Sequence, residues 1–394
     1  MDRFFLSTGT VCGYVLDFEG QVPHRERLAA RIMERAASIK SLLALPPSPG
    51  QRCWTLRQQP LREDVHVRNV VCSREAGGME TAVNALLGQP LPEAPHPSWD
   101  VWLLHIPGQR HFRIVYRALH ASQDGAGAAY AMLALLADHP TPGPHPYSAA
   151  LPTGRGWLLA GRNLLRALRP DKSWPVLRAR PSRRTRWYHA DATESHLQEV
   201  AGRHSVTVND VCLAGMADAL GRWCRALPGT GRSMQKLSVL VPMSLRQDNE
   251  RYRVGNRLTA YHQTLPCHLS DFTHALRNIH RQSQAARIHR VRDAARLALG
   301  LLPVPLGQRM VGAAFGAAAA PMLISSITLS SKFTCLGGRS SAASLICDPI
   351  NGQLCYISFT RAAGLVRCGI VCDDALPQAR SLPTLWRQSV RSHR

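Results

Sequence analysis

The stretch YRALHASQDGAGAAYAML, residues 116–133, joins an alternating apolar segment to a run of small residues. The alternation up to His120 is typical of a strand, and the small residues after Gly125 indicate a closely packed helix. A histidine at a strand end can accept a proton near neutral pH, because the ordinary pKa of its ring is about 6.5. His120 and the nearby carboxylate of Asp124 are therefore candidate catalytic residues. The alternative is a structural histidine that happens to end a strand.

Strand-like and helix-like segments alternate along the whole chain. The first half predicts strands at 10–20 and 65–73, helices at 24–45 and 79–89, and a hairpin over 99–120. The second half predicts a strand at 186–191, helices at 192–204, 207–227 and between 270 and 300, strands at 236–245 and 256–266, and a final hairpin over 353–372. This order predicts an α/β protein.

We expect two α/β lobes, formed by residues 1–150 and 186–394, with a linker over 151–185 between them. Ten Lys or Arg and one Asp lie within 155–186, so the linker is strongly basic. The whole chain carries a formal net charge of +22. Such a surface attracts anions such as coenzyme phosphates, acidic lipid, nucleic acid or an acidic carrier protein. A coding bias toward arginine would also explain the charge without any ligand.

Several site motifs do not occur in the sequence. It has no G-x-S-x-G, no G-x-x-x-x-G-K-[ST] and no G-x-G-x-x-G after a strand, which argues against a serine hydrolase, an ATPase and a dinucleotide enzyme. It also has no C-x-x-C and no H-E-x-x-H, so we expect no metal site. No recognisable nucleic-acid-binding module accompanies the charge, so we expect no nucleic acid partner.

The eleven cysteines are scattered through apolar runs, which is typical of reduced thiols in a cytoplasmic protein. The N-terminal residues show no basic segment followed by an apolar core, so we expect no secretory signal. The window 310–329 is long and apolar enough to suggest a membrane span, but Pro321 interrupts it. We expect a buried helix that runs into a strand there, and peripheral contact with a membrane stays open.

The heptad LHASQDG, residues 119–125, resembles the H-H-x-x-x-D-G motif of bacterial wax ester synthase/diacylglycerol acyltransferases and of condensation domains from nonribosomal peptide synthetases. Three further segments resemble the first of these families: VTVNDVCLAGMADAL at 206–220, VPMSLR at 241–246 and GNRLT at 255–259. The C-terminal LGGRSSAASLICDPINGQLCYISF resembles its closing hairpin. These matches cover most of the chain in the right order.

The resemblance implies two chloramphenicol-acetyltransferase-like lobes that form a pseudo-dimeric V with an active-site tunnel at their interface. His120 would be the general base that activates an alcohol or amine acceptor, which then attacks an acyl thioester directly. The thioester would belong to coenzyme A or to the phosphopantetheine of an acidic acyl carrier protein. It is a substrate, so no bound cofactor is expected.

The same resemblance assigns roles to residues in both lobes. Asp124 would pair with Arg246 and hold the motif loop in shape, and Gly125 would let the backbone pass close to the thioester arm. Asn256 and Arg257 would shape the tunnel or the thioester site; the alternative for them is an ordinary turn after a surface loop.

The basic linker is a candidate for binding the thioester donor. Its arginines Arg178, Arg180, Arg183 and Arg184 would receive the phosphates of coenzyme A or an acidic carrier protein, unless they form an ordinary solvated surface.

Two positions depart from the family pattern. Leu119 stands where the motif has its first histidine, and Ser326 stands where the family has asparagine before a Pro-Gly turn. The departures favour a specialised ester or amide over storage lipid. They also leave a second hypothesis open, in which the protein performs a cyclisation or has a binding role without acyl transfer.

Overall fold

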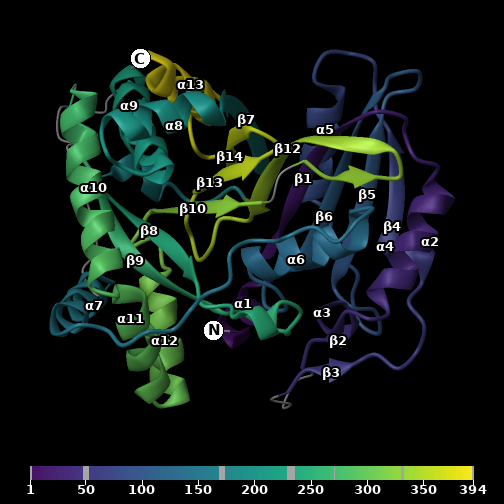
Figure 1. The fold of residues 1–394 in the computed structure, drawn as a ribbon, viewed down its shortest axis with the longest axis horizontal. Coiled ribbons are helices and arrows are strands. Elements are labelled where there is room, and N and C mark those ends of the chain that lie inside the picture. The colour runs from purple at the N-terminus through teal and green to yellow at the C-terminus, as the bar shows by residue number, and fades with distance from the viewer. Residues whose placement is uncertain are drawn as a thin grey trace.

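The computed structural model describes residues 2–47, 53–167, 174–228, 236–269, 271–329 and 332–392. Two six-stranded sheets form the centres of two lobes, with helices packed around them (Figure 1). The first sheet has the order β11 (Thr334–Cys335), β12 (Gly338–Cys347), β1 (Val11–Glu19), β6 (His111–Leu119), β5 (Trp99–His105) and β4 (Val67–Val71). The second has the order β7 (Thr185–Thr193), β14 (Leu365–Asp373), β13 (Cys355–Ala362), β10 (Met322–Thr328), β8 (Leu237–Ser244) and β9 (Leu258–Leu265). A two-stranded sheet joins β2 (Ala44–Leu45) to β3 (Thr55–Leu56).

The helices divide between the two lobes. The N-terminal half contains α1 (Asp2–Thr8), α2 (Arg25–Ala36), α3 (Lys40–Leu43), α4 (Glu63–His66), α5 (Gly78–Leu87) and α6 (Gly125–Leu136). The remaining α-helices are α7 (Gly154–Ala167), α8 (Glu194–Arg203), α9 (Val208–Ala226), α10 (Phe272–Ile288), α11 (Val291–Leu301), α12 (Val304–Ala314) and α13 (Leu382–Ser392). Short 3₁₀ turns lie at η1 (Pro175–Arg178), η2 (Asp248–Glu250) and η3 (Ala379–Ser381). The predicted α/β architecture with two lobes is confirmed.

Strand β12 belongs to the first sheet, although it lies in the C-terminal half of the chain. It pairs antiparallel with β1, and Ala343, Leu345 and Cys347 on it are buried in the core of the first lobe. The predicted boundary at residue 186 therefore does not separate the two sheets, because the free edge of β1 takes up a strand from beyond it. Figure 1 shows β12 extending from the second lobe toward the first.

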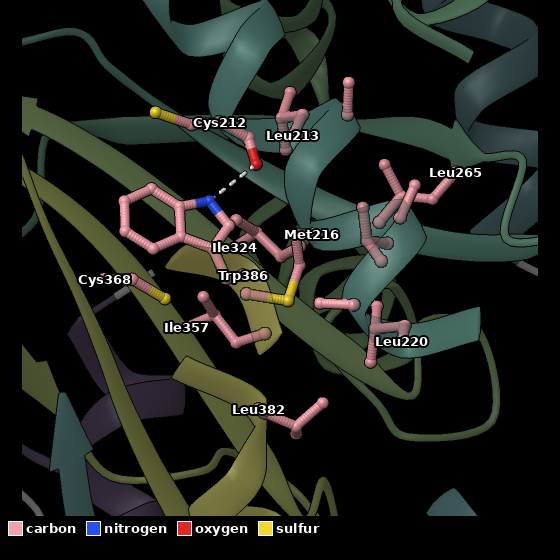
Figure 2. Packing of buried hydrophobic residues seen from close by; sticks show 14 of the residues in the cluster. Cys212, Leu213, Met216, Leu220, Leu265, Ile324, Ile357, Cys368, Leu382 and Trp386 are labelled. Carbon is pink, nitrogen blue, oxygen red and sulfur yellow. Dashed lines mark hydrogen bonds between the residues drawn. The ribbon is translucent and has the colours of Figure 1, made fainter. Parts of the chain in front are cut away.

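The core of the second lobe is built around α9, which begins at a capping box. The Thr207 hydroxyl accepts a hydrogen bond from the Asp210 amide, and the Asp210 carboxylate accepts one from the Thr207 amide. Helix α13 packs against α9, and the Trp386 indole donates a 3.1 Å hydrogen bond to the Cys212 carbonyl (Figure 2). This bond satisfies a buried donor and fixes how the C-terminal helix lies on the core.

The apolar window at 310–329 contains the end of α12 followed by β10, so the expected order of helix and strand is present. The helix is not buried as expected, because Val311 is its only buried residue among those whose burial is described. Within the described ranges, no helix is long and apolar enough to cross a membrane.

A buried ion cluster also joins the two sheets. Asp17 on β1 pairs with Arg113 on β6 and accepts a 2.6 Å hydrogen bond from Arg367 on β14. Arg367 in turn makes a bidentate pair with Asp191 on β7, at 2.7 Å for each bond. Burial acts to raise the pKa of Asp17, but Arg367 and Arg113 outweigh it and lower that pKa to about 2.

This cluster predicts how stability depends on acid. The pKa of Asp17 is lower in the folded chain than the value of about 3.9 expected when unfolded. Its contribution to the free energy of unfolding is therefore full above that unfolded value and is lost as the pH falls toward 2. Between pH 5 and pH 3 we expect it to account for about 1 kcal/mol of the loss, measured by urea unfolding. Asp17→Asn should lose correspondingly less over this interval, and the exposed Asp248→Asn should behave as wild type. Equal losses in all three proteins would contradict this assignment.

Candidate active site

His120 lies just beyond β6, where the chain turns toward α6. Its backbone N–H donates to the Thr10 carbonyl at 2.8 Å, which extends the pairing of β6 with β1 by one step. Asp124 then caps α6, because its carboxylate accepts a 2.8 Å hydrogen bond from the Gly127 amide. The motif is thus a short loop held between a strand end and a helix start.

The His120 ring is enclosed on one face and held at one edge. Phe5 of α1 stacks on it with ring centroids 4.0 Å apart and planes 3° apart. Its Nδ1 lies 2.9 Å from Oδ1 of Asn256. The residue is 7 % exposed, and burial lowers the pKa of the ring below its usual 6.5. His120 is therefore neutral at physiological pH.

Asn256 determines which ring nitrogen carries the proton. Its Nδ2 lies 3.4 Å from two acceptors, an Asp2 carboxylate oxygen and the Ala121 carbonyl, so its Oδ1 is the atom that faces His120. An acceptor oxygen at that position requires a proton on Nδ1 of the histidine. Nε2 of His120 is then unprotonated, and nothing in the described part of the chain hydrogen-bonds to it.

Asp124 and Arg246 form a buried ion pair across the two lobes. Arg246 Nε and Nη2 donate to the two carboxylate oxygens at 3.2 and 2.9 Å, and the side chains are 1 % and 3 % exposed. The remaining guanidinium N–H groups donate to the carbonyls of Glu250, Arg253 and Gly255. All five donors of Arg246 are satisfied, which offsets the cost of burying the charge.

Asp124 has no oxygen left for a substrate. Besides Arg246 and the Gly127 amide, it accepts a 2.6 Å hydrogen bond from the Arg257 amide. The sequence predicts Asp124 as a catalytic residue, whereas its contacts are those of a positioning residue that fixes the loop. The contact expected between Asp124 and Arg246 is present.

The segment around Asn256 is fastened to the motif loop from the second lobe. The Gly255 amide donates to the Ser122 carbonyl at 2.8 Å, and Gly255 has a φ of 92°. This left-handed backbone conformation favours glycine, and a Cβ there would also lie 2.4 Å from the Asp2 carboxylate, which would have to shift. The Arg257 side chain pairs with Glu250 at 3.1 Å and does not line the central cavity described next.

A cavity of about 270 Å³, called here the central cavity, lies between the lobes beside His120. Its walls include Phe5 and Gly125 from the first lobe and Pro242, Ser325 and Ser326 from the second. A second histidine, the exposed His145, also lines it.

The second sheet is open where it borders the central cavity. Strands β8 and β10 are paired only at Leu240 and Leu323 among their described residues. Beyond this pair, Pro242, Met243 and Ser326 line both the central cavity and a second pocket of about 530 Å³. This second pocket lies on the side of the sheet where α9 and α10 contribute to its wall. The central cavity therefore adjoins this second pocket through the gap between the two strands.

The second pocket is basic, and we call it the arginine pocket after Arg287, Arg290 and Arg292 in its wall. Arg292 also lies over the Tyr147 ring, with 4.3 Å from its Cζ to the ring centroid, and Arg287 is 4.0 Å from Asp210. Asp293 in the same wall is engaged by the Tyr147 hydroxyl and the Ala150 amide. The positive charge of the pocket is thus only partly compensated.

The structure brings together most of the residues expected at the site. His120, Asp124, Arg246 and Asn256 form one hydrogen-bonded group, and Ser326 lines both the central cavity and the arginine pocket. Gly125 also lines the cavity. A Cβ added there would lie 3.4 Å from the Leu345 side chain, which is an ordinary van der Waals contact.

Two groups of expected site residues lie elsewhere. Leu119 packs against the core of the first lobe and does not line the central cavity. The arginines 180, 183 and 184 are exposed and line neither the cavity nor the arginine pocket. Only the backbone of Arg178 is among the described residues, at the end of η1.

Some site residues were not anticipated from the sequence. Phe5 and Asp2 reach His120 and Asn256 from α1, and no motif marks that helix. The arginine pocket had a signal, the basic run RIHRVR at 287–292, but the sequence does not show that this helix end faces the gap between β8 and β10. In the described residues, no group of three or more His, Cys, Asp or Glu has a geometry that could hold a metal ion.

No family model matches the sequence, and no curated protein matches it. Solved structures do match. A wax ester synthase/diacylglycerol acyltransferase from Marinobacter aquaeolei VT8 is 16% identical, with a TM-score of 0.69 over 99% of this chain and 96% of that one. The first condensation domain of the calcium-dependent antibiotic synthetase is 15% identical, with a TM-score of 0.63 over 97% and 89%. This chain has their fold.

A third similar structure was solved with ligands. It is the starter condensation domain of rhizomide synthetase in complex with C8-CoA and Leu-SNAC, 13% identical to this chain, with a TM-score of 0.61 over 97% of this chain and 88% of that one. At these identities the likeness concerns the fold, and the chemistry has to be argued from the residues of this chain.

The hydrogen bond between Asn256 and His120 predicts a response to substitution. Asn256→Asp places a carboxylate beside Nδ1, which favours the protonated ring and should raise the pKa of His120 relative to wild type. The measurement is an NMR titration of the His120 ring signal. The His105→Ala variant identifies the signal of His105, so that it is not taken for that of His120. A wild-type pKa at or above 6.5, or no rise in Asn256→Asp, would contradict the described geometry.

The buried ion pair predicts a large effect on stability. Arg246→Ala leaves the Asp124 carboxylate buried without its partner and should lower the free energy of unfolding by about 3–5 kcal/mol. The matched control is Arg251→Ala, which breaks an exposed pair with Asp248 and should cost no more than about 1 kcal/mol. Urea unfolding monitored by circular dichroism gives both values, and similar losses in the two variants would contradict the prediction.

Proposed function

We propose that the protein transfers an acyl group from a thioester to a hydroxyl or amine acceptor, with Nε2 of His120 as the general base. The observation that carries this proposal is the position of His120 on the central cavity, with its Nδ1 2.9 Å from the Asn256 side-chain oxygen. A ring that carries its proton on Nδ1 can accept another only through Nε2, and burial lowers the pKa of the His120 ring below its usual value.

The proposed reaction is a direct transfer. Nε2 takes the proton of the acceptor as its oxygen or nitrogen attacks the thioester carbonyl carbon. The tetrahedral intermediate then collapses, the carbon–sulfur bond breaks, and the leaving thiolate takes the proton from Nε2. The products are an ester or amide and a free thiol, and His120 returns to its starting state. General base catalysis of this kind contributes about 10² to 10⁴ in rate.

Two features support a thioester as the donor. The central cavity adjoins the arginine pocket through the gap between β8 and β10, so a donor arm can pass through the gap while its phosphates meet arginines. The similar starter condensation domain was solved with C8-CoA, which is such a thioester. We therefore propose Arg287, Arg290 and Arg292 as the donor's phosphate contacts. The exposed linker arginines are a second candidate region.

The catalytic proposal is tested by replacing the two histidines that line the central cavity. Purified protein is incubated with acyl-CoA and N-acetylcysteamine thioesters and a panel of alcohols and amines, and product is measured by mass spectrometry. His120→Ala should reduce the rate at least about 100-fold, while His105→Ala on β5 should retain wild-type activity. Full activity in His120→Ala, or a loss confined to His145→Ala, would overturn the assignment.

The donor proposal predicts a difference between two kinds of thioester. Arg290→Glu reverses one charge of the arginine pocket and should raise KM for coenzyme A thioesters at least about tenfold, the equivalent of roughly 1.4 kcal/mol. KM for N-acetylcysteamine thioesters, which carry no phosphate, should not change. Arg184→Glu in the linker is the matched control. A rise in KM for Arg184→Glu alone would assign the donor to the linker.

A further inference from the structure

Residues 143–147, called here the strap, connect the two lobes beside the central cavity. They follow α6, which begins at the Asp124 cap, and lead to α7, which packs against α11. The strap lies in neither a helix nor a strand, and two of its residues, Pro144 and His145, line the central cavity. The position of the strap therefore decides what a substrate meets at this wall of the cavity.

The strap is anchored to the fold on both sides of its histidine. On one side, the Tyr130 hydroxyl of α6 donates a hydrogen bond to the Pro144 carbonyl. On the other side, the Tyr147 amide donates to the Arg246 carbonyl at 2.8 Å, and the buried Tyr147 hydroxyl donates to Asp293 on α11. Because its neighbours are held in this way, the backbone of the histidine between them is fixed at the cavity wall.

The His145 side chain does not contribute to this anchoring. It is exposed, and within the described ranges it forms no hydrogen bond, ion pair or ring contact. In the neutral imidazole one ring nitrogen is a donor and the other an acceptor, so both are available to a ligand. A free ring on an anchored backbone is pre-organised to contact a molecule in the cavity.

Hydroxyl groups on β10 add to the polar part of the central cavity. Ser326 and Thr328 line it, are exposed, and their hydroxyls form no hydrogen bond in the described part of the chain. No Lys, Arg or Glu is among the described residues of its wall, and the oxygens of Asp124 are already engaged. A few free polar groups on an otherwise apolar wall are the arrangement that orients a ligand and selects it.

We propose that His145 hydrogen-bonds to the acceptor and favours acceptors that carry a second polar group, such as an amide or a hydroxyl, in addition to the reacting hydroxyl or amine. This inference rests on the proposed acyl transfer, because the reacting group has to lie at Nε2 of His120. An acceptor without a second polar group displaces water from the His145 ring and offers no hydrogen bond in return. His145 is thus a contact for the acceptor and not a second base.

The first experiment compares two alcohols as acceptors with one thioester donor. N-Acetylethanolamine carries an amide in addition to its hydroxyl, and 1-pentanol has the same chain length without the amide. His145→Ala should raise KM for N-acetylethanolamine about fivefold, the usual effect of one lost hydrogen bond, and leave kcat unchanged. The kinetics with 1-pentanol should not change. His145→Asn, whose amide keeps a donor and an acceptor, should restore part of the lost affinity.

The matched control is His139→Ala, because this exposed histidine lies in the same connecting segment and does not line the cavity. It should leave the kinetics with both alcohols unchanged. An equal loss for both alcohols in His145→Ala would indicate a structural role, and no loss for either would indicate no contact. Each of these two results would overturn the inference.

The second experiment needs no turnover, so it separates failure of this inference from failure of the proposed function. Each alcohol is titrated into the protein without a donor, and NMR follows the His145 ring signal, which is identified by its absence in His145→Ala. N-Acetylethanolamine should shift this signal in a saturable way, and 1-pentanol should not. No shift with either alcohol would overturn the inference even where acyl transfer is found. A saturable shift without any acyl transfer would retain the contact and reject the reaction.

Discussion

The buried ion pair between Asp124 and Arg246 is the interaction on which the site depends. It joins the start of α6 in the first lobe to the end of β8 in the second, and the same arginine holds three carbonyls of the loop that leads to Asn256. A charge pair this deeply buried is stable only when its remaining donors and acceptors are satisfied, and here both partners meet that condition. Because the loop is fixed in this way, Asn256 can hold the His120 ring in one tautomer.

The central cavity and the arginine pocket differ in chemistry. The central cavity beside His120 has mostly apolar walls, such as Phe5, Leu258 and Phe315. The arginine pocket offers three cations on the side of the second sheet where α9 and α10 lie. The two adjoin where β8 and β10 part.

The sequence predicted the local parts of this arrangement better than the distant ones. The hairpin at 99–120 and the helix after Gly125 were recognisable because their residues are neighbours in the chain. The predicted helix at 24–45 is instead interrupted between Ala36 and Lys40, where the extended, buried Ile39 turns the chain into the core. Periodicity alone does not reveal such a break, because Ile39 fits the apolar pattern of either a continuous or a divided helix.

Contacts between distant segments account for what the sequence did not predict. Residues of α1 reach Asn256 across 254 positions, and β12 completes the sheet of the other lobe. The linker arginines are dense in sequence and can be recognised there, whereas only the fold shows that Arg287, Arg290 and Arg292 lie beside the gap in the sheet. Leu119 shows the reverse case, since its departure from the family motif is conspicuous in sequence but its side chain packs away from the cavity.

The central claim is that the fold holds His120 neutral, with its proton on Nδ1 and Nε2 free for the acceptor. Nitrogen-15 NMR of the His120 ring at pH 7 tests it directly, because protonated and unprotonated ring nitrogens have distinct chemical shifts. The account predicts a proton on Nδ1 and none on Nε2. A proton on Nε2 with Nδ1 bare, or a doubly protonated ring, would contradict it.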